Sequence, residues 1–177
     1  TSSEARAGFP LYPALVPLTG RWAGYPMTVA RRLARNFPDA RRGADLALAS
    51  DLPSAAGMSS SSALIVATFL ALAEVNHLQT TDTWRQHLST PEALSEYLGC
   101  IENGQSFGPL GGDRGVGTFG GSQDHTAILC CHAGLVSRRS RAVDRRVAME
   151  GEGAARWNRI IDGAGVDGCV IVHDRPD

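Results

Sequence analysis

Four consecutive serines, Ser59 to Ser62, follow a loop of small residues and open an apolar run, and this arrangement can bind phosphate. The first backbone N–H groups of a helix have no partner within the helix, and the helix dipole adds partial positive charge there. Small residues let an anion approach closely, and serines add hydroxyl groups. The alternative is that Ser59 is only an N-cap and Gly57 only a turn residue. We favour the phosphate site because Pro53, Gly57 and the serine run occur together.

The serine run lies between two segments that must position it. Residues Asp45 to Asp51 alternate, with Leu46 and Leu48 on one side, which predicts a strand leading into the loop. The nearly unbroken apolar run from Ala63 to Val75 predicts a helix that is buried on most of its circumference. The expected local architecture is strand, loop and buried helix.

Two further helices are predicted from local signals. Apolar residues at helical spacing between Thr28 and Phe37 predict an amphipathic helix that ends before Pro38. We expect three of its residues on a solvated face, namely Arg31, Arg32 and Arg35. Thr90 as N-cap and Pro91 at the first helical position predict another helix, which ends near Glu102.

The segment from Asn103 to Ser122 contains eight glycines and is predicted to be a loop, either a mobile lid or a disordered insertion. Asp124 lies two residues after it, and the short apolar run Ala127 to Cys130 predicts a buried strand. A carboxylate between a loop and a strand is well positioned for chemistry. Neighbouring side chains of a strand point to opposite faces, so if Asp124 faces a site, His125 has a structural or hydrogen-bonded role.

Residues Pro53 to Leu64 resemble the phosphate-loop motif of the GHMP kinases, Pro-x-x-x-Gly-Leu-x-Ser-Ser-Ala, and are closest to its galactokinase branch. Met58 stands for the usual Leu, Ala55 for a usual Gly and Ser62 for a usual Ala. Gly121 to His125 resembles a second element, in which Gly-x-x-Asp-Gln follows a Glu-ended helix and a glycine-rich stretch. Here His125 replaces the Gln, and the interval after Glu102 is longer than usual.

The resemblance implies an α/β fold, the two-layer α+β N-terminal domain of GHMP kinases (ribosomal protein S5 domain 2-like). It also implies an ATP- and Mg²⁺-dependent kinase that phosphorylates a sugar hydroxyl, with galactose converted to galactose 1-phosphate as the default reaction. Asp124 would orient or deprotonate the sugar hydroxyl, and Ser61 and Glu102 would hold Mg²⁺. The residues implied to contact ATP are Pro53, Ala55, Gly57, Met58, Ser59, Ser60, Ser61 and Ser62.

The resemblance covers about half of the 177 residues, and two other motifs of the family are not recognised. We therefore expect a fragment, or ordered pieces of a longer chain. Residues 1–148 would be a partial N-terminal phosphate-loop domain, and residues 149–177 at most the start of the C-terminal domain.

Three other functions stay open. Another GHMP sugar kinase, such as an arabinokinase, would share the phosphate loop. A catalytically silent galactokinase-like protein would bind sugar or nucleotide and act through protein partners. A serine hydrolase built on Gly57-Met58-Ser59 is disfavoured, because Ser61 stands where the Gly-x-Ser-x-Gly elbow needs its second glycine.

Composition excludes some classes of protein. All 17 basic residues are arginine, so a Walker-A lysine and a pyridoxal-phosphate lysine are both absent from these residues. The net charge of −1, and an arginine cluster at 138–146 that no aromatic residue interrupts, predict a solvated loop and no nucleic-acid partner. The apolar run after Ser62 is too short for a membrane span. Four cysteines without a Cys-x-x-Cys pair predict free thiols and a cytoplasmic protein. The small-molecule sugar substrate is implied by the resemblance alone.

Overall fold

The computed structural model describes residues 6–50, 59–117, 123–132, 136–140, 143–147 and 171–173. The chain divides into two compact units, Thr1–His125 and Thr126–Asp177, which are described separately. Four residues of the predicted phosphate loop lie outside the described residues, namely Pro53, Ala55, Gly57 and Met58.

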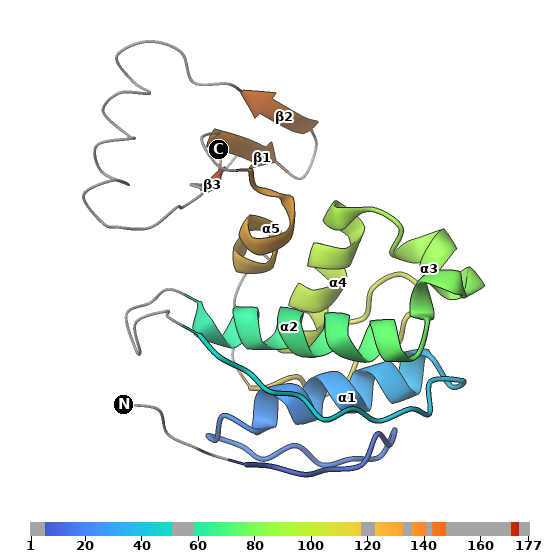
Figure 1. Ribbon diagram of the computed structural model, residues 1–177. Helices are drawn as coiled ribbons and strands as arrows, with labels where there is room; N and C mark the ends of the chain where they lie inside the picture. The colour runs from blue at the N-terminus through green and yellow to red at the C-terminus, as the bar shows by residue number, and fades with distance from the viewer. Residues whose placement is uncertain are drawn as a thin grey trace. The chain divides into compact units, whose positions relative to one another are not determined.

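The first unit is a group of packed helices (Figure 1). In chain order they are α1 (Gly24–Asn36), α2 (Ser60–Val75), the 3-10 helix η1 (Leu78–Thr80), α3 (Asp82–His87) and α4 (Pro91–Asn103). Helix α1 packs against α2, and α4 contacts both. These three helices enclose the core of the unit, which includes Val29, Leu33, Ile65, Phe69, Tyr97, Leu98 and Ile101.

Aromatic side chains tie α2, α3 and α4 together. The ring of Phe69 on α2 meets the ring of Tyr97 on α4 edge to face, with centroids 5.6 Å apart. It also stacks with Trp84 of α3, with centroids 6.2 Å apart. Both geometries are favoured for aromatic pairs, and burial of such large side chains dominates the energetics of a small core.

Helix α1 confirms the predicted amphipathic helix but not its predicted solvated face. Arg35 is exposed as expected, whereas Arg31 and Arg32 are both buried. The prediction was wrong because α1 is covered on most sides, and these two arginines find partners far along the chain.

The predicted helices α2 and α4 are both present. Helix α2 buries Ile65, Phe69 and the other members of one stripe, while Leu70 on the opposite side is partly exposed. Helix α4 begins as predicted, with the Thr90 hydroxyl accepting a hydrogen bond from Ala93 N–H at 3.1 Å. It ends at Gly104, whose φ of 77° is easily adopted only by glycine.

The predicted strand at Asp45 to Asp51 is not present in the part of it that the structure describes. Residues 45–50 form no regular structure, and Leu46 and Leu48 are 39% and 48% exposed. An alternating pattern fits any extended segment, and a strand also needs a ladder partner. Just before this stretch, the Asn76 side chain accepts a hydrogen bond from Arg42 N–H and donates one to the Arg42 carbonyl, both at 2.9 Å.

The second unit begins within α5 (Gln123–Cys130), a helix where a buried strand was predicted from Ala127 to Cys130. A four-residue apolar run fits a strand or a helix turn equally well, and here it continues a helix begun at Gln123. The unit also holds β1 (Val136–Ser140), β2 (Val143–Val147) and β3 (Ile171–His173).

These strands form a sheet in the order β2-β1-β3. Strands β1 and β2 are antiparallel, with Val136 opposite Val147, and β1 and β3 are parallel, with Ser137 opposite Ile171. The arginine cluster was predicted to be a solvated loop, but its described arginines lie in β1 and β2. Alternation was hidden there because the residues between the two valine ends are nearly all polar.

Cysteine pairing differs in part from the prediction. Cys100 and Cys130 are not in a disulfide, as expected, but Cys131 is disulfide-bonded. The prediction failed there because it considered only spacing along the chain, which cannot reveal pairs brought together by the fold.

The described residues are mostly helical, and their named strands all lie in the second unit. The expected two-layer α+β arrangement is therefore not confirmed. Within the described part of the chain, no helix is long and apolar enough to cross a membrane.

Candidate active site

The start of α2 has an unusual backbone conformation. Ser59, which precedes the helix, has φ 54° and ψ 39°, a left-handed conformation that is uncommon for serine. Its carbonyl accepts a hydrogen bond from Ala63 N–H at 3.0 Å, but its side chain makes no capping bond. The beginning of α2 is thus not closed by its own cap residue, as an N-cap serine would normally close it.

The serine run lies against the last turn of α4. The hydroxyl of Ser62, which is only 2% exposed, donates to Glu102 Oε2 at 3.0 Å. The hydroxyl of Ser61, one residue earlier, also acts on the Glu102 carboxyl and lowers its pKa. Two hydroxyls from the first turn of α2 and one carboxylate from α4, 40 residues further along, therefore form one polar group of atoms.

His125 on α5 makes a third contact with the same carboxylate. Its Nε2 lies 3.2 Å from Glu102 Oε2, at ion-pair distance but without the alignment of a linear hydrogen bond. The imidazole is only 1% exposed, and its Nδ1 has no hydrogen-bond partner among the described residues. His125 was predicted to have a structural or hydrogen-bonded role, and the structure places it against Glu102, the predicted Mg²⁺ ligand.

These contacts set the charge of Glu102. Burial alone would raise the pKa of this carboxyl, but the close imidazole of His125, with the hydroxyls of Ser62 and Ser61, outweighs burial. The pKa of Glu102 is consequently lowered below its usual value, so the side chain is an anion at neutral pH. With 14% of its surface exposed, it is a partly accessible anion next to two hydroxyls.

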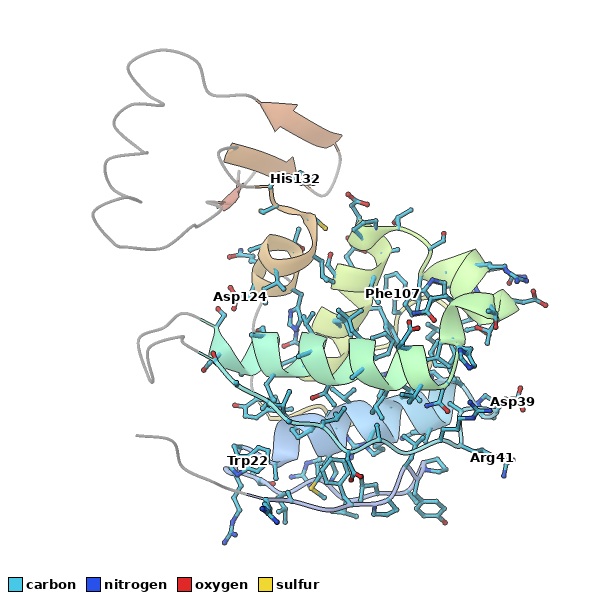
Figure 2. The ribbon with its side chains drawn as sticks, viewed as in Figure 1. Trp22, Asp39, Arg41, Phe107, Asp124 and His132 are labelled. Carbon is cyan, nitrogen blue, oxygen red and sulfur yellow. The ribbon has the colours of Figure 1, made fainter. Side chains whose placement is uncertain are left out.

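Asp124 lies in the first turn of α5 and is exposed (Figure 2). Adjacent residues of an α-helix are about 100° apart around its axis, so exposed Asp124 and buried His125 face different directions. The strand argument had also separated them, although the element is a helix. The described residues include no group of three His, Cys, Asp or Glu side chains that could hold a metal ion.

A glycine-rich loop follows Glu102, and its described residues 104–117 are tied closely to the end of α4. Val116 N–H donates to the Glu102 carbonyl at 2.9 Å, and Asp113 N–H to the Gly104 carbonyl at 2.9 Å. A Cβ on Gly115, whose φ is 64°, would lie 2.5 Å from the Glu102 carbonyl oxygen. The glycines are needed because backbone packs directly on backbone. The loop prediction is confirmed for this part.

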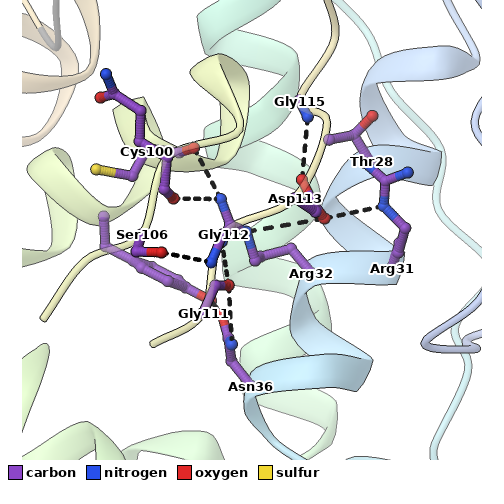
Figure 3. Close-up of polar contacts among 12 residues, drawn as sticks. Thr28, Arg31, Arg32, Asn36, Cys100, Ser106, Gly111, Gly112, Asp113 and Gly115 are labelled. Carbon is purple, nitrogen blue, oxygen red and sulfur yellow. Dashed lines mark hydrogen bonds and ion pairs between the residues drawn. The ribbon is translucent and has the colours of Figure 1, made fainter. Parts of the chain in front are cut away.

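Two arginines of α1 hold this loop (Figure 3). The buried Arg32 guanidinium donates to three carbonyls, those of Gly111, Cys100 at 2.8 Å and Gln105 at 2.6 Å. Arg31 Nε donates to Asp113 Oδ2 at 2.9 Å, and Asp113 Oδ1 accepts from Gly115 N–H at 3.0 Å. Below, Arg31, Arg32 and Asp113 are called the arginine clamp.

The arginine clamp balances burial against pairing. Burial lowers the pKa of Arg32, and the opposite charge of Asp113 acts to raise it. A buried charge is tolerated only when it is paired and hydrogen-bonded, as here. Sequence analysis missed the arginine clamp because nothing local distinguishes Arg31 and Arg32 from exposed helix arginines.

Comparison with known proteins supplies an independent view of these residues. Residues 24–104 match the family model described as the GHMP kinases N terminal domain, a range that includes the serine run and Glu102 but not Asp124 or His125. No solved structure gives a significant match.

Curated relatives are similar over part of the chain. The galactokinase of Pasteurella multocida is 32% identical over 113 residues, which cover 64% of this chain and 27% of that protein. A galactokinase of Actinobacillus pleuropneumoniae serotype 5b is 39% identical over 56 residues, which cover 32% of this chain and 15% of that protein. The chain thus matches less than a third of the length of either relative.

Proposed function

We propose, from the premise that this chain is a relative of the GHMP kinases and similar in part to galactokinases, that it belongs to an ATP-dependent sugar kinase. The γ-phosphoryl group of ATP would pass to a sugar hydroxyl, and galactose, giving galactose 1-phosphate, is the substrate we propose first. One observation carries the proposal: Ser62 at the start of α2 hydrogen-bonds the Glu102 carboxylate, beside Ser61, whose hydroxyl lowers the pKa of the same group. A helix N-terminus that can bind phosphate therefore lies next to a carboxylate that can bind a metal ion.

The first part of the proposal concerns ATP. The phosphates would lie against the start of α2, with Ser59 and Ser60 in contact with them and residues 53–58 forming the preceding loop. The missing side-chain cap at Ser59 supports this, because a helix start without its own cap favours an external anion. The left-handed Ser59 supports it too, since strained backbone is concentrated at ligand sites.

The second part concerns Mg²⁺, which Ser61 and Glu102 would hold. Magnesium is bound through one or two carboxylates and substrate phosphates, so a site with one carboxylate and one hydroxyl fits it without a larger acidic cluster. An ionised and partly exposed Glu102 supplies the hard oxygen ligand. When bound, Mg²⁺ neutralises charge on the phosphates during transfer.

The third part concerns the acceptor hydroxyl, for which Asp124 is proposed. As the new O–P bond forms and the bond from phosphorus to the ADP oxygen breaks, the hydroxyl proton would move to the Asp124 carboxylate. Exposure of Asp124 on the first turn of α5 leaves its carboxylate accessible for this contact.

Three further predictions, on the fold, the location and the small-molecule partner, remain part of the proposal. The first is the two-layer α+β N-terminal domain fold, with residues 1–148 in that domain and 149–177 at the start of a second. The second is a cytoplasmic location, and the third is a sugar as the small-molecule partner.

The test is ATP consumption by the full-length protein with Mg²⁺ against a panel of free sugars. Asp124→Asn should lower sugar-dependent turnover by about 10³-fold, within the range for loss of a general base, without changing the melting temperature. Asp82→Asn, a change at an exposed aspartate in the first turn of α3, is the matched control and should keep full turnover.

Two results would oppose the proposal. Full turnover in Asp124→Asn would remove Asp124 from the mechanism. Nucleotide binding without turnover on any sugar would favour the catalytically silent binding protein instead.

A further inference from the structure

Glu102 is held through one of its two carboxylate oxygens. Oε2 accepts a hydrogen bond from the Ser62 hydroxyl at 3.0 Å and lies 3.2 Å from His125 Nε2. Both of these side chains are almost fully buried, and they come from different helices, α2 and α5. A carboxylate fixed at Oε2 by two buried groups cannot rotate freely, so the direction of its other oxygen is also set.

His125 is costly if its role is only to fill space. Buried imidazoles normally satisfy both ring nitrogens, yet among the described residues Nδ1 has no hydrogen-bond partner and Nε2 has only the imperfectly aligned contact with Glu102. An apolar side chain of similar size would avoid the cost of a buried unpaired nitrogen. Its one polar contact among the described residues is Glu102.

We propose that His125 is a positioning residue, which uses its Nε2–H together with Ser62 to hold the Glu102 carboxylate in the orientation that binds Mg²⁺. This inference rests on the proposed function, because it assigns a role toward the Mg²⁺ of that site. Groups that hydrogen-bond a metal ligand fix its orientation, and their loss typically weakens metal binding 10- to 100-fold.

Histidine offers a sharp pair of substitutions. In His125→Gln the amide nitrogen reaches about as far from the backbone as Nε2, whereas in His125→Asn it stops one methylene short, near the position of Nδ1. The two variants have the same polar group and differ only in its reach. The apolar His125→Leu removes the donor altogether.

The experiment uses the full-length protein and Mn²⁺ as the probe ion, with a non-hydrolysable ATP analogue present. Binding of Mn²⁺ is followed by electron paramagnetic resonance, and thermal unfolding is recorded for each variant. His125→Asn and His125→Leu should weaken Mn²⁺ binding about tenfold or more, and His125→Gln should stay within about threefold of the original protein. His77→Gln, at an exposed histidine beyond the other end of α2, should change nothing.

Each contrary result has a distinct meaning. Equal Mn²⁺ affinity in the Gln and Asn variants overturns the positioning role, even if both unfold at lower temperature, because a purely structural histidine would behave in that way. This comparison holds whether or not the Leu variant folds. If the unmodified protein binds no Mn²⁺ with the nucleotide analogue, the proposed function fails and the positioning role fails with it.

Discussion

Two of the segments that contact Glu102, the loop after it and the start of α2, are built in opposite ways. The loop at residues 104–117 has its backbone bonded to the end of α4 and is held by the arginine clamp. The start of α2 has a left-handed serine and no side-chain cap. The difference shows that Glu102 can be fixed through its backbone by the loop while its side-chain carboxylate faces a helix start that is open to an anion.

Removal of Arg32 should have the largest effect on the loop side of this comparison. Arg32→Leu leaves Asp113 with one arginine instead of two and removes one donor from each of three carbonyls. We expect the free energy of unfolding to fall by about 3–5 kcal/mol, as when one partner of a buried charge pair is lost. Urea denaturation measures it.

Arg35→Leu is the matched control, because Arg35 lies on the same helix but is exposed. It should change the free energy of unfolding by no more than about 0.5 kcal/mol. Similar losses in the two variants would mean that the loop does not depend on the arginine clamp.

Ser59→Gly should have a smaller effect of opposite sign at the start of α2. Glycine adopts positive φ without steric cost, so relief of strain at φ 54° should raise the free energy of unfolding by up to about 1 kcal/mol. Ser60→Gly, one residue inside the helix, should lower it by about 0.5–1 kcal/mol. Thermal or urea unfolding of the two variants measures the change. If Ser59→Gly lowers the free energy of unfolding as much as Ser60→Gly does, Ser59 is not strained.

Local signals account for what the sequence predicted correctly. Thr90 and Pro91 mark the start of α4 by their own hydrogen bonding and ring geometry, and the apolar run after Ser62 is long enough to be recognised as a helix. Short segments failed, because alternation at 45–50 and four apolar residues at 127–130 fit more than one element.

Contacts between distant residues could not be predicted. Arg31 and Asp113 are 82 positions apart, and only the fold turns a helix arginine into part of the arginine clamp. For the candidate site, motif resemblance named Ser61, Glu102 and Asp124, whose roles stay predictions, and the structure brings Ser62 of the same serine run into contact with Glu102. The contact of His125 with Glu102 was missed because Ala127 to Cys130 was expected to be a strand, which gave the neighbouring side chain the wrong geometry.

The central claim is that the start of α2 and Glu102 form one site for phosphate and Mg²⁺. The most direct measurement is the affinity of the full-length protein for ATP with and without Mg²⁺, compared between Glu102→Gln and Glu96→Gln, an exposed position on the same helix. We expect Mg²⁺ to tighten ATP binding by about tenfold or more in the original protein and in Glu96→Gln, and to have no such effect in Glu102→Gln. An unchanged Mg²⁺ effect in Glu102→Gln would contradict the account.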